Sequence, residues 1–329
     1  MKRFSSIIFF VLIFSSYSLG EQDKWEPPRT WFGDPDLQGT WTNASLTTLE
    51  RPDNYEELIV TEKQAKEVAK QAGEFTELID NPYEEGESPQ AGDDVGGYNT
   101  AWMDPGTQLF KLNGQYRSSI LTYPENGRLP RRWVVWGKEA FGIYRMFTQA
   151  NHPEQRSLGE RCLVGFGSSG GPPMLNVLYN NHYQIVQAQN YVMILVEMVH
   201  DARIIRLKGK SLSEGVRPWL GDSVGYWEGD TLVVKTKNHH PQQKFRAGIR
   251  HQILLTEGAE VTERFTRTSE NEILYQFTVN DQVAYKDIWS GEMPLRTAEG
   301  KIYEYACHEG NYSMANILAG AREMERIEQ

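Results

Sequence analysis

The stretch that decides the fold runs from Tyr183 to Met198 and reads YQIVQAQNYVMILVEM. Apolar and polar residues alternate in its first half, β-branched and other apolar residues fill its second half, and Gln189-Asn190 separates the two. This pattern is typical of two antiparallel strands joined by a two-residue turn. We therefore predict a β-hairpin with one strand over residues 183–188 and its partner from residue 191 onward.

Further strands follow the hairpin at short intervals. The predicted ones are Ala202–Leu207, Ser223–Trp227, Thr231–Lys237, Val261–Thr266, Ile273–Val279 and Lys301–Tyr305. Short strands rich in Val, Ile, Thr and Tyr favour an antiparallel barrel or sandwich over a parallel sheet. The final stretch, Tyr312–Ile327, has apolar residues at helical spacing and is expected to dock as a C-terminal helix.

The N-terminal half predicts a more mixed set of elements. Expected are a strand at Asp36–Trp41, a helix that starts at the capping box Thr61–Gln64 and ends near Leu78, a surface loop over residues 81–98, a strand pair within Leu109–Tyr123 and a short helix at Gly137–Gln149. We divide the chain into residues 21–182, with strand, helical and loop segments, and residues 183–329, with the β meander and terminal helix. Together they are expected to form one compact domain over residues 36–329.

The opening strand carries Gly39-x-Trp41, which resembles the opening of lipocalins. In that family the glycine lets the first strand bend and the tryptophan closes one end of the barrel. We therefore expect a mainly β fold, an antiparallel up-and-down, lipocalin-like (calycin-like) barrel with N-terminal helical segments and a C-terminal helix. A β-sandwich with helical attachments is the alternative.

Residues 1–20 have the parts of a secretory signal peptide. Lys2 and Arg3 precede the apolar run Ile7–Phe14, and Ser18 and Gly20 supply small residues for cleavage. The alternative, a transmembrane anchor, needs a longer apolar run. We predict export to the periplasm or the cell exterior, with no transmembrane segment after cleavage of the signal.

The charge balance excludes some partners. The chain has 34 Lys and Arg against 44 Asp and Glu, a formal net charge of −10, and shows no basic cluster. A nucleic-acid-binding protein needs a basic face to neutralise phosphates. We expect a small-molecule ligand or substrate and no nucleic acid, while the sequence indicates no oligomeric state.

The chain has two cysteines, Cys162 and Cys307, and two interpretations of their state are possible. Export permits a disulfide between them, and two buried free thiols are the alternative. Beside Cys162, the glycine-rich run Gly165–Pro173 lacks the Lys-Ser/Thr ending of a phosphate-binding loop. We expect a flexible loop there. The alternative is a lid that covers a bound ligand.

Polar residues inside an apolar strand mark the first candidate site. Glu197, His200, Asp201 and Arg203 lie within seven residues. In an extended chain, alternation would put Glu197, Asp201 and Arg203 on one face and His200 on the other. These residues then either converge on a ligand at a barrel mouth or form a surface pair where the strand leaves the core.

Two other segments contribute candidates. In the first, Tyr303–Tyr312, His308 and Glu309 lie at a predicted strand-to-helix junction, where Asn311 either contacts a ligand or caps the helix. The second carries His182, which could meet either of the other clusters. His239 and His240 precede a proline and are expected on a solvated surface.

Several of these segments belong to one wider pattern. The segments are Tyr98–Trp102, Gly127–Pro130, Glu160–Leu163, Asn180–Gln187, Glu197–Arg203, Trp219–Ser223, Trp227–Val234 and Tyr303–Tyr312. Together they resemble an uncharacterised family of secreted bacterial β-rich proteins. The resemblance implies no reaction, because the family has no established activity known to us, but it places the candidate residues inside the recognisable motifs.

The functional hypothesis is an exported lyase, isomerase or hydrolase that transfers protons on a small organic or carbohydrate-like molecule. His200 and His308 would transfer protons, and Asp201 or Glu309 would orient them. The substrate-binding candidates are Arg161 and Arg203, which would hold a negatively charged group, with His182, Glu197 and Asn311. No cofactor is expected, and a divalent metal held by His182, His200 and His308 is an alternative. The other function class is a lipocalin-like carrier of an amphipathic molecule, with aromatic residues lining its cavity.

Overall fold

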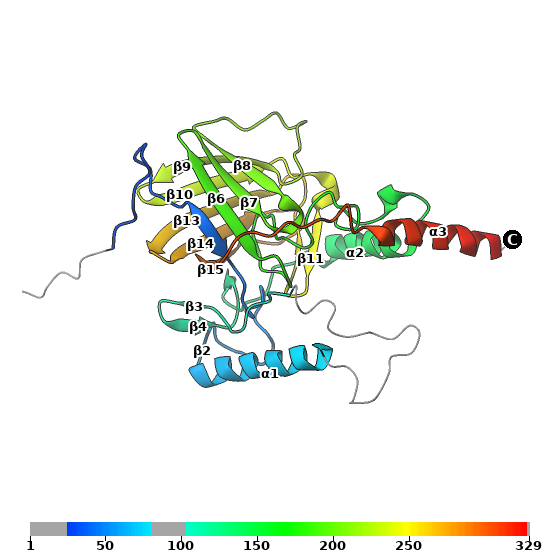
Figure 1. The fold of residues 1–329 in the computed structure, drawn as a ribbon, viewed down its shortest axis with the longest axis horizontal. Helices are drawn as coiled ribbons and strands as arrows, with labels where there is room; N and C mark the ends of the chain where they lie inside the picture. The colour runs from blue at the N-terminus through cyan, green and yellow to red at the C-terminus, as the bar shows by residue number, and fades with distance from the viewer. Residues whose placement is uncertain (1–24, 81–102, 328–329) are drawn as a thin grey trace, which may run out of the picture.

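A computed structural model describes residues 25–80 and 103–327 (Figure 1). The elements are β1 (Gly39–Thr42), β2 (Ile59–Val60), α1 (Glu62–Asp80), β3 (Lys111–Leu112), β4 (Gln115–Arg117), β5 (Leu121–Tyr123), α2 (Trp133–Thr148), β6 (His182–Ala188), β7 (Tyr191–Val196), β8 (Ala202–Leu207), β9 (Asp222–Glu228), β10 (Thr231–Lys237), β11 (Phe245–Gly248), β12 (His251–Leu254), β13 (Glu260–Ser269), β14 (Glu272–Asn280), β15 (Trp289–Thr297) and α3 (Tyr312–Ile327). The expected signal peptide and the loop at 81–98 lie outside the described residues.

The main body is a closed β-barrel. Its strand order is β1-β6-β7-β8-β9-β10-β13-β14-β15, and β15 returns to β1, where Trp41 pairs with Thr297. Strand β5 adds a further pairing on β15. The mainly β, lipocalin-like barrel with attached helices is therefore confirmed, as is the hairpin of β6 and β7.

One pair of strands departs from the antiparallel order that we expected. Strands β8 and β9 run parallel, with Ile205 opposite Ser223. A parallel pair needs a long crossover between its strands. Residues 208–221 supply this crossover and arch above the barrel in Figure 1. The barrel is mixed rather than strictly antiparallel.

Some strand predictions failed. The predicted strand Lys301–Tyr305 is irregular, while β15, which was not predicted, closes the barrel. The hairpin of β11 and β12 was also not predicted. Elsewhere the predicted strands occur with small changes at their ends.

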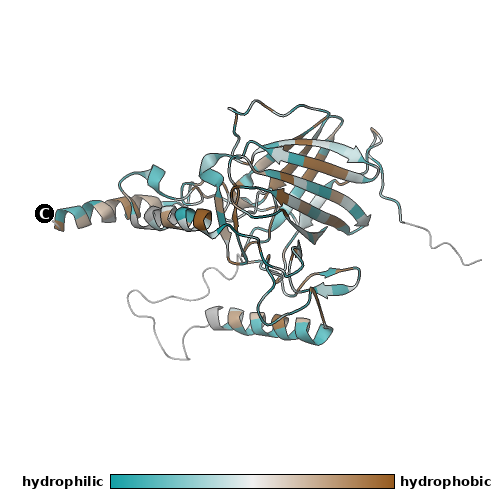
Figure 2. Cartoon of the chain, turned by 180° about the vertical axis from the view of Figure 1, so that it is seen from behind, coloured by the Kyte–Doolittle hydropathy of each residue, from teal (hydrophilic) through white to brown (hydrophobic). Residues whose placement is uncertain are grey.

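Alternation along the strands fills the barrel interior. In β14, for example, Ile273, Tyr275, Phe277 and Val279 are buried while the residues between them are partly exposed. Figure 2 shows the same alternation of hydrophobic and hydrophilic positions along the strands. Trp41 is buried near the start of the barrel, with its indole N–H donating to the Leu37 carbonyl and the Arg267 guanidinium 5.3 Å from its ring.

A smaller layer lies beside the barrel. Strands β2, β4 and β3 form a short sheet that packs with α1 around Leu46, Val60, Ala65 and Leu109. The predicted capping box is present, because the Gln64 backbone N–H donates to the Thr61 hydroxyl and the Gln64 side chain accepts from the Thr61 backbone N–H. These bonds satisfy donors that a helix start otherwise leaves unpaired.

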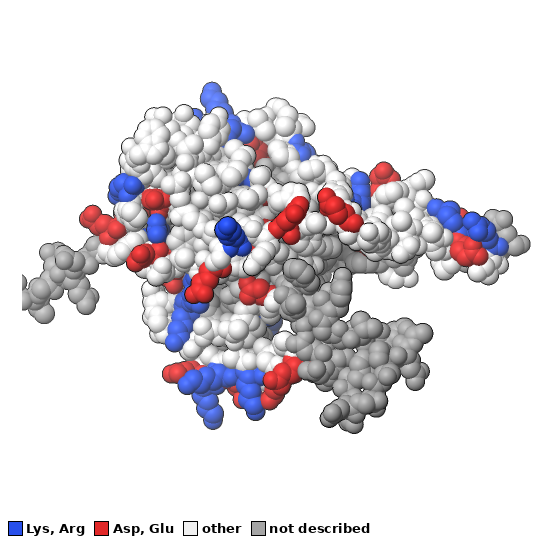
Figure 3. All heavy atoms as spheres, viewed as in Figure 1, with Lys and Arg blue, Asp and Glu red and all other residues white. Residues whose placement is uncertain are grey.

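Helices α2 and α3 project from one side of the barrel (Figures 1 and 2). Helix α2 begins at Trp133, four residues before the predicted start, and α3 has the predicted bounds. No residue of α3 is fully buried, so its expected docking is only partial. Across the described part of the chain, no helix combines the length and the apolar character that a membrane crossing requires. Basic and acidic side chains are interspersed on the face shown in Figure 3.

Candidate functional site

The barrel interior is filled rather than hollow. The glycine-rich loop, residues 165–173, was expected to be flexible, but Ser168 to Pro173 are buried. The Ser168 hydroxyl donates to the Pro173 carbonyl at 2.6 Å, and the Tyr183 hydroxyl donates to the Ser169 carbonyl at 2.9 Å. The next residue, Met174, donates its backbone N–H to the Tyr275 hydroxyl. We call residues 165–174 the plug, and it acts as part of the core instead of a lid.

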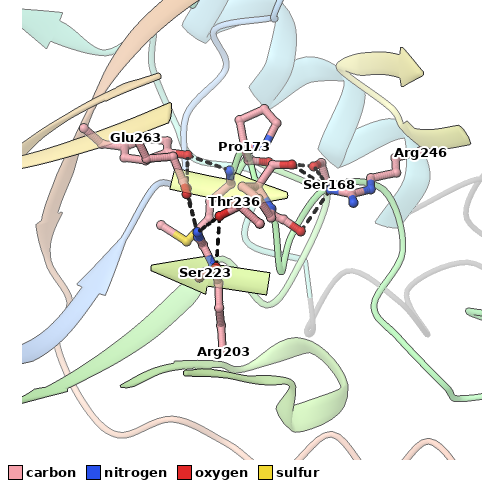
Figure 4. Close-up of polar contacts among 11 residues, drawn as sticks. Ser168, Pro173, Arg203, Ser223, Thr236, Arg246 and Glu263 are labelled. Atoms are coloured by element: carbon pink, nitrogen blue, oxygen red, sulfur yellow. Dashed lines mark hydrogen bonds and ion pairs between the residues drawn. The ribbon is translucent and has the colours of Figure 1, made fainter. Parts of the chain in front are cut away.

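Arg203 lies inside this core and not at a barrel mouth. Its three guanidinium nitrogens donate to Glu263, Ser223 and Thr236, and its side chain is 1% exposed (Figure 4). Both carboxylate oxygens of Glu263 accept from Arg203, and Oε1 also accepts from the Tyr275 hydroxyl at 2.8 Å. Arg203 therefore holds strands β8, β9, β10 and β13 together and is enclosed away from any external ligand.

A hollow of about 410 Å³ opens at the end of the barrel beside the plug. Its lining is apolar and consists of Phe166, Val177, Leu178, Tyr179, Met198, Ala247, Gly248 and Ile249. We call it the end hollow. Its volume lies in the range that small-molecule sites occupy.

A strained turn borders the end hollow. The chain was expected to stay extended from Tyr191 to Leu207, but it breaks at Met198–His200, where Val199 has φ 58° and His200 has φ 44°. A β-branched residue in this left-handed region is a conformational outlier, and such strain gathers at functional sites. The turn places Met198 in the lining and ends the alternation from which we inferred that Glu197, Asp201 and Arg203 share a face.

Glu197 forms an ion pair beneath this turn. Its carboxylate lies 2.8 Å from Nδ1 of His182 and accepts the backbone N–H of Tyr303 at 3.1 Å. The hydrogen bond to Glu197 raises the pKa of His182. Burial alone would raise the pKa of Glu197, but the bonds from His182 and Tyr303 outweigh burial and lower it. Both pKa changes favour the charged forms, so at neutral pH His182 is protonated to a greater extent than a free histidine.

Asp201 follows the turn and differs from Glu197 because no cationic side chain among the described residues forms an ion pair with it. One carboxylate oxygen accepts the Gly165 backbone N–H at 3.0 Å. Burial raises the pKa of Asp201 to about 6, against the opposing effects of this bond and of His200. A carboxyl group that titrates near neutrality can both take up and release a proton.

Three segments that the sequence pointed to separately meet here. His182 reaches Glu197, Tyr303 reaches Glu197, and the Tyr305 ring lies parallel to the Tyr179 ring with centroids 6.4 Å apart. The predicted proton-transfer histidines are arranged differently, because His200 and His308 are both exposed, as is Glu309. Of the predicted proton-transfer groups and their possible partners among the described residues, His182, Glu197 and Asp201 are the ones at least partly withdrawn from solvent.

The remaining candidates support the C-terminal segment. Cys162 and Cys307 form a disulfide, so the first interpretation is confirmed and they are not free thiols. Asn311 donates to the Glu160 carbonyl at 2.7 Å and its side chain accepts the Met314 backbone N–H, so it caps α3. Arg161 is partly exposed on the same loop as Cys162.

The histidines do not assemble into a metal centre. Over residues 25–80 and 103–327 no group of three or more His, Cys, Asp and Glu side chains could hold an ion. His239, expected on the surface, is 1% exposed, and burial lowers its pKa to about 3. His240 instead packs against Trp219, with ring centroids 3.9 Å apart and the ring planes tilted by 37°.

Two residues of the interior were missed by sequence reasoning. Glu263 lies two residues from both Val261 and Phe265, so the alternation along β13 could have placed it on their inward face. Arg246 lies in the unpredicted β11 and has no comparable signal. Comparisons with family models, with curated proteins and with solved structures find no match to this chain.

Proposed function

We propose that this chain is an exported enzyme that moves a proton to or from a small organic molecule bound in the end hollow. The observation that carries the proposal is the strained turn at Val199 and His200, which lies between Glu197 and Asp201 in the chain and follows Met198 of the apolar lining. Backbone strain of this kind persists where the surrounding structure enforces it, and it is frequent at active sites and ligand-binding sites.

Asp201 has the role of proton-transfer group. Its neighbour Gly165 precedes Phe166 of the lining, and Met198 of the lining accepts the Phe166 backbone N–H at 3.1 Å. Asp201 and the end hollow are therefore built on the same two chain segments. A carboxylate base is most effective in surroundings that exclude water, because desolvation raises its basicity.

The His182–Glu197 pair supports a second proton position. Nδ1 of His182 is held by Glu197, which leaves Nε2 as the nitrogen that can exchange a proton. The carboxylate stabilises the imidazolium form and fixes the ring orientation, as an acidic partner of a catalytic histidine does. This arrangement fits a lyase, isomerase or hydrolase rather than a redox enzyme.

A probe reaction tests Asp201 without knowledge of the natural substrate. Nitrobenzisoxazole is a planar apolar molecule from which a carboxylate removes the ring C–H proton while the N–O bond breaks, giving a coloured cyanonitrophenolate. We expect the protein to accelerate this reaction with a rate that rises through about pH 6. Asp201→Asn should lower the accelerated rate by about 100-fold or more.

The matched control is Asp230→Asn, which changes an exposed aspartate that pairs with Arg29. It lies in the β9–β10 turn, at the end of the barrel away from Ala202, where β8 begins. Asparagine at position 201 can still accept the Gly165 N–H, so the fold should survive. Equal rates in Asp201→Asn and Asp230→Asn would refute the proposed role.

Carriage of an amphipathic molecule is the competing function, and the apolar lining of the end hollow favours it. Because side chains fill the barrel interior, such a ligand would bind in the end hollow and not in the lumen. The probe separates the two functions, because a carrier would bind nitrobenzisoxazole without accelerating its elimination above the rate given by Asp201→Asn.

A further inference from the structure

Arg246 is a buried cation that neither the barrel fold nor the proposed reaction explains. It lies on β11, is 3% exposed and donates from Nε to the Gln243 carbonyl at 3.2 Å. Its Nη1 donates to the Gly171 and Pro172 carbonyls, both at 2.9 Å, and to the Ser168 hydroxyl at 3.3 Å (Figure 4). One edge of the guanidinium is thus fully engaged with the plug.

The other edge has no partner. Nη2 of Arg246 is buried and makes no hydrogen bond to any of the described residues. A guanidinium presents five N–H donors, two of them on this nitrogen. Buried donors are almost always paired, and a charged one without a partner is strongly destabilising because it has lost its hydration.

The charge of Arg246 is also unbalanced. The enclosed carboxylate near it is Glu263, and both oxygens of Glu263 are bonded to Arg203. No described carboxylate lies within ion-pair distance of Arg246. Burial, and then the charge of Arg203, lower the pKa of Arg246 to about 10, so it still carries its proton at neutral pH.

Neighbouring ionisable groups do not supply the missing negative charge. Burial lowers the pKa of His239 to about 3 and that of His251 to about 4, so both rings are neutral. Burial raises the pKa of Tyr285, so its phenol keeps its proton. Among the described residues, the cluster of Arg203, Glu263 and Arg246 therefore holds two guanidinium charges against one carboxylate.

We propose that a small inorganic anion, represented by chloride, binds Nη2 of Arg246 inside the barrel. The anion would balance the second guanidinium and accept both unpaired N–H groups. It would stabilise the contact between Arg246 and the plug, and with it the wall beside the end hollow. The site is structural and does not depend on the proposed enzymatic activity.

Thermal unfolding of the whole protein tests the site in sodium chloride against sodium gluconate at equal ionic strength, because gluconate is a much larger anion than chloride. Chloride at 100 times its dissociation constant should favour the folded state about 100-fold, which corresponds to a rise in Tm of about 4 to 8 °C. Equal Tm values in the two salts across the concentration range would overturn the proposal.

Variants locate the effect. Arg246→Met should abolish the difference between the two salts, whereas Arg264→Met, which changes a partly exposed arginine of the barrel strand β13 that pairs with Glu228, should retain it. A chloride effect that persists in a folded Arg246→Met would place the anion elsewhere and overturn the assignment.

Wild-type crystals soaked in sodium bromide give a readout that survives if Arg246→Met does not fold. An anomalous peak at hydrogen-bond distance from Arg246 Nη2 is expected. Density showing an adventitious ion only, at the protein surface, would refute the interior site.

Discussion

The ion pair of Arg203 and Glu263 permits a quantitative test of what holds the barrel closed. Glu263 is fully buried and accepts two hydrogen bonds from Arg203 and one from the Tyr275 hydroxyl. Glu263→Gln keeps the volume of the side chain and a hydrogen-bond acceptor but removes the charge. The Arg203 guanidinium would then remain in the interior with no compensating carboxylate.

The expected loss follows from that burial. Removing one partner of a buried ion pair costs about 3–5 kcal/mol, because the remaining charge stays out of water. The matched control is Glu260→Gln on the same strand, whose carboxylate pairs with Lys237 and is 33% exposed. Partly exposed pairs contribute up to about 1 kcal/mol, so the two variants should differ by about 2 kcal/mol or more.

Urea unfolding followed by circular dichroism gives the free energy of unfolding for both variants. The double variant Arg203→Met/Glu263→Met should recover most of the loss, since replacing a whole buried ion pair with apolar side chains is often neutral or stabilising. The argument is refuted if Glu263→Gln and Glu260→Gln lower the free energy of unfolding equally. A double variant less stable than Glu263→Gln would instead show that the hydrogen bonds matter more than the charge.

Two further predictions concern the site. The folded-state pKa of Asp201, about 6, lies above its ordinary value of 3.8, so the stability that this carboxyl contributes is complete below about pH 4 and is lost as the pH rises through 6. Asp201→Asn should therefore remove a decline of up to about 3 kcal/mol between pH 4 and pH 7, measured by urea unfolding at each pH, and an unchanged pH profile would contradict the burial of this group. Cys307→Ser opens a bridge between residues 145 positions apart and should lower the free energy of unfolding by about 2–4 kcal/mol. Dithiothreitol should destabilise the wild-type protein by the same amount and leave Cys307→Ser unchanged, and insensitivity of both proteins to reductant would argue against the disulfide.

Much of the barrel could be predicted because its strands alternate regularly. The predicted strands Ala202–Leu207 and Thr231–Lys237 have their observed bounds, since apolar residues recur at the spacing that buries one face. Strand β15 has no such clear signal, because Gly291 and Pro294 interrupt it and are typical of turns. Conversely, the aromatic alternation of Lys301–Tyr305 belongs to an irregular segment held by Tyr305 stacking and by the Cys307 disulfide.

The candidate site was predictable in its segments but not in its geometry. Sequence reasoning selected Glu197, Asp201 and His182, which do gather at one end of the barrel. It could not foresee the break at Val199, because a β-branched residue is a poor candidate for a left-handed conformation. Because the break was not foreseen, alternation wrongly placed Arg203 on the same face as Glu197 and Asp201. The exposure of His200, which lies in the turn, could not be predicted either.

Barrel closure also constrains the order in which the molecule assembles. Strand β1 pairs with β15, so the barrel closes only when the segment around Trp41 pairs with the segment around Thr297. Pairing between such distant parts of a chain is slow, because a large loop has to close first. The plug and Arg203 lie inside the closed barrel. Their hydrogen bonds therefore have to form before or during the pairing that closes the barrel. Late formation of the β1–β15 seam would make the final folding step the one that excludes water from the buried charges.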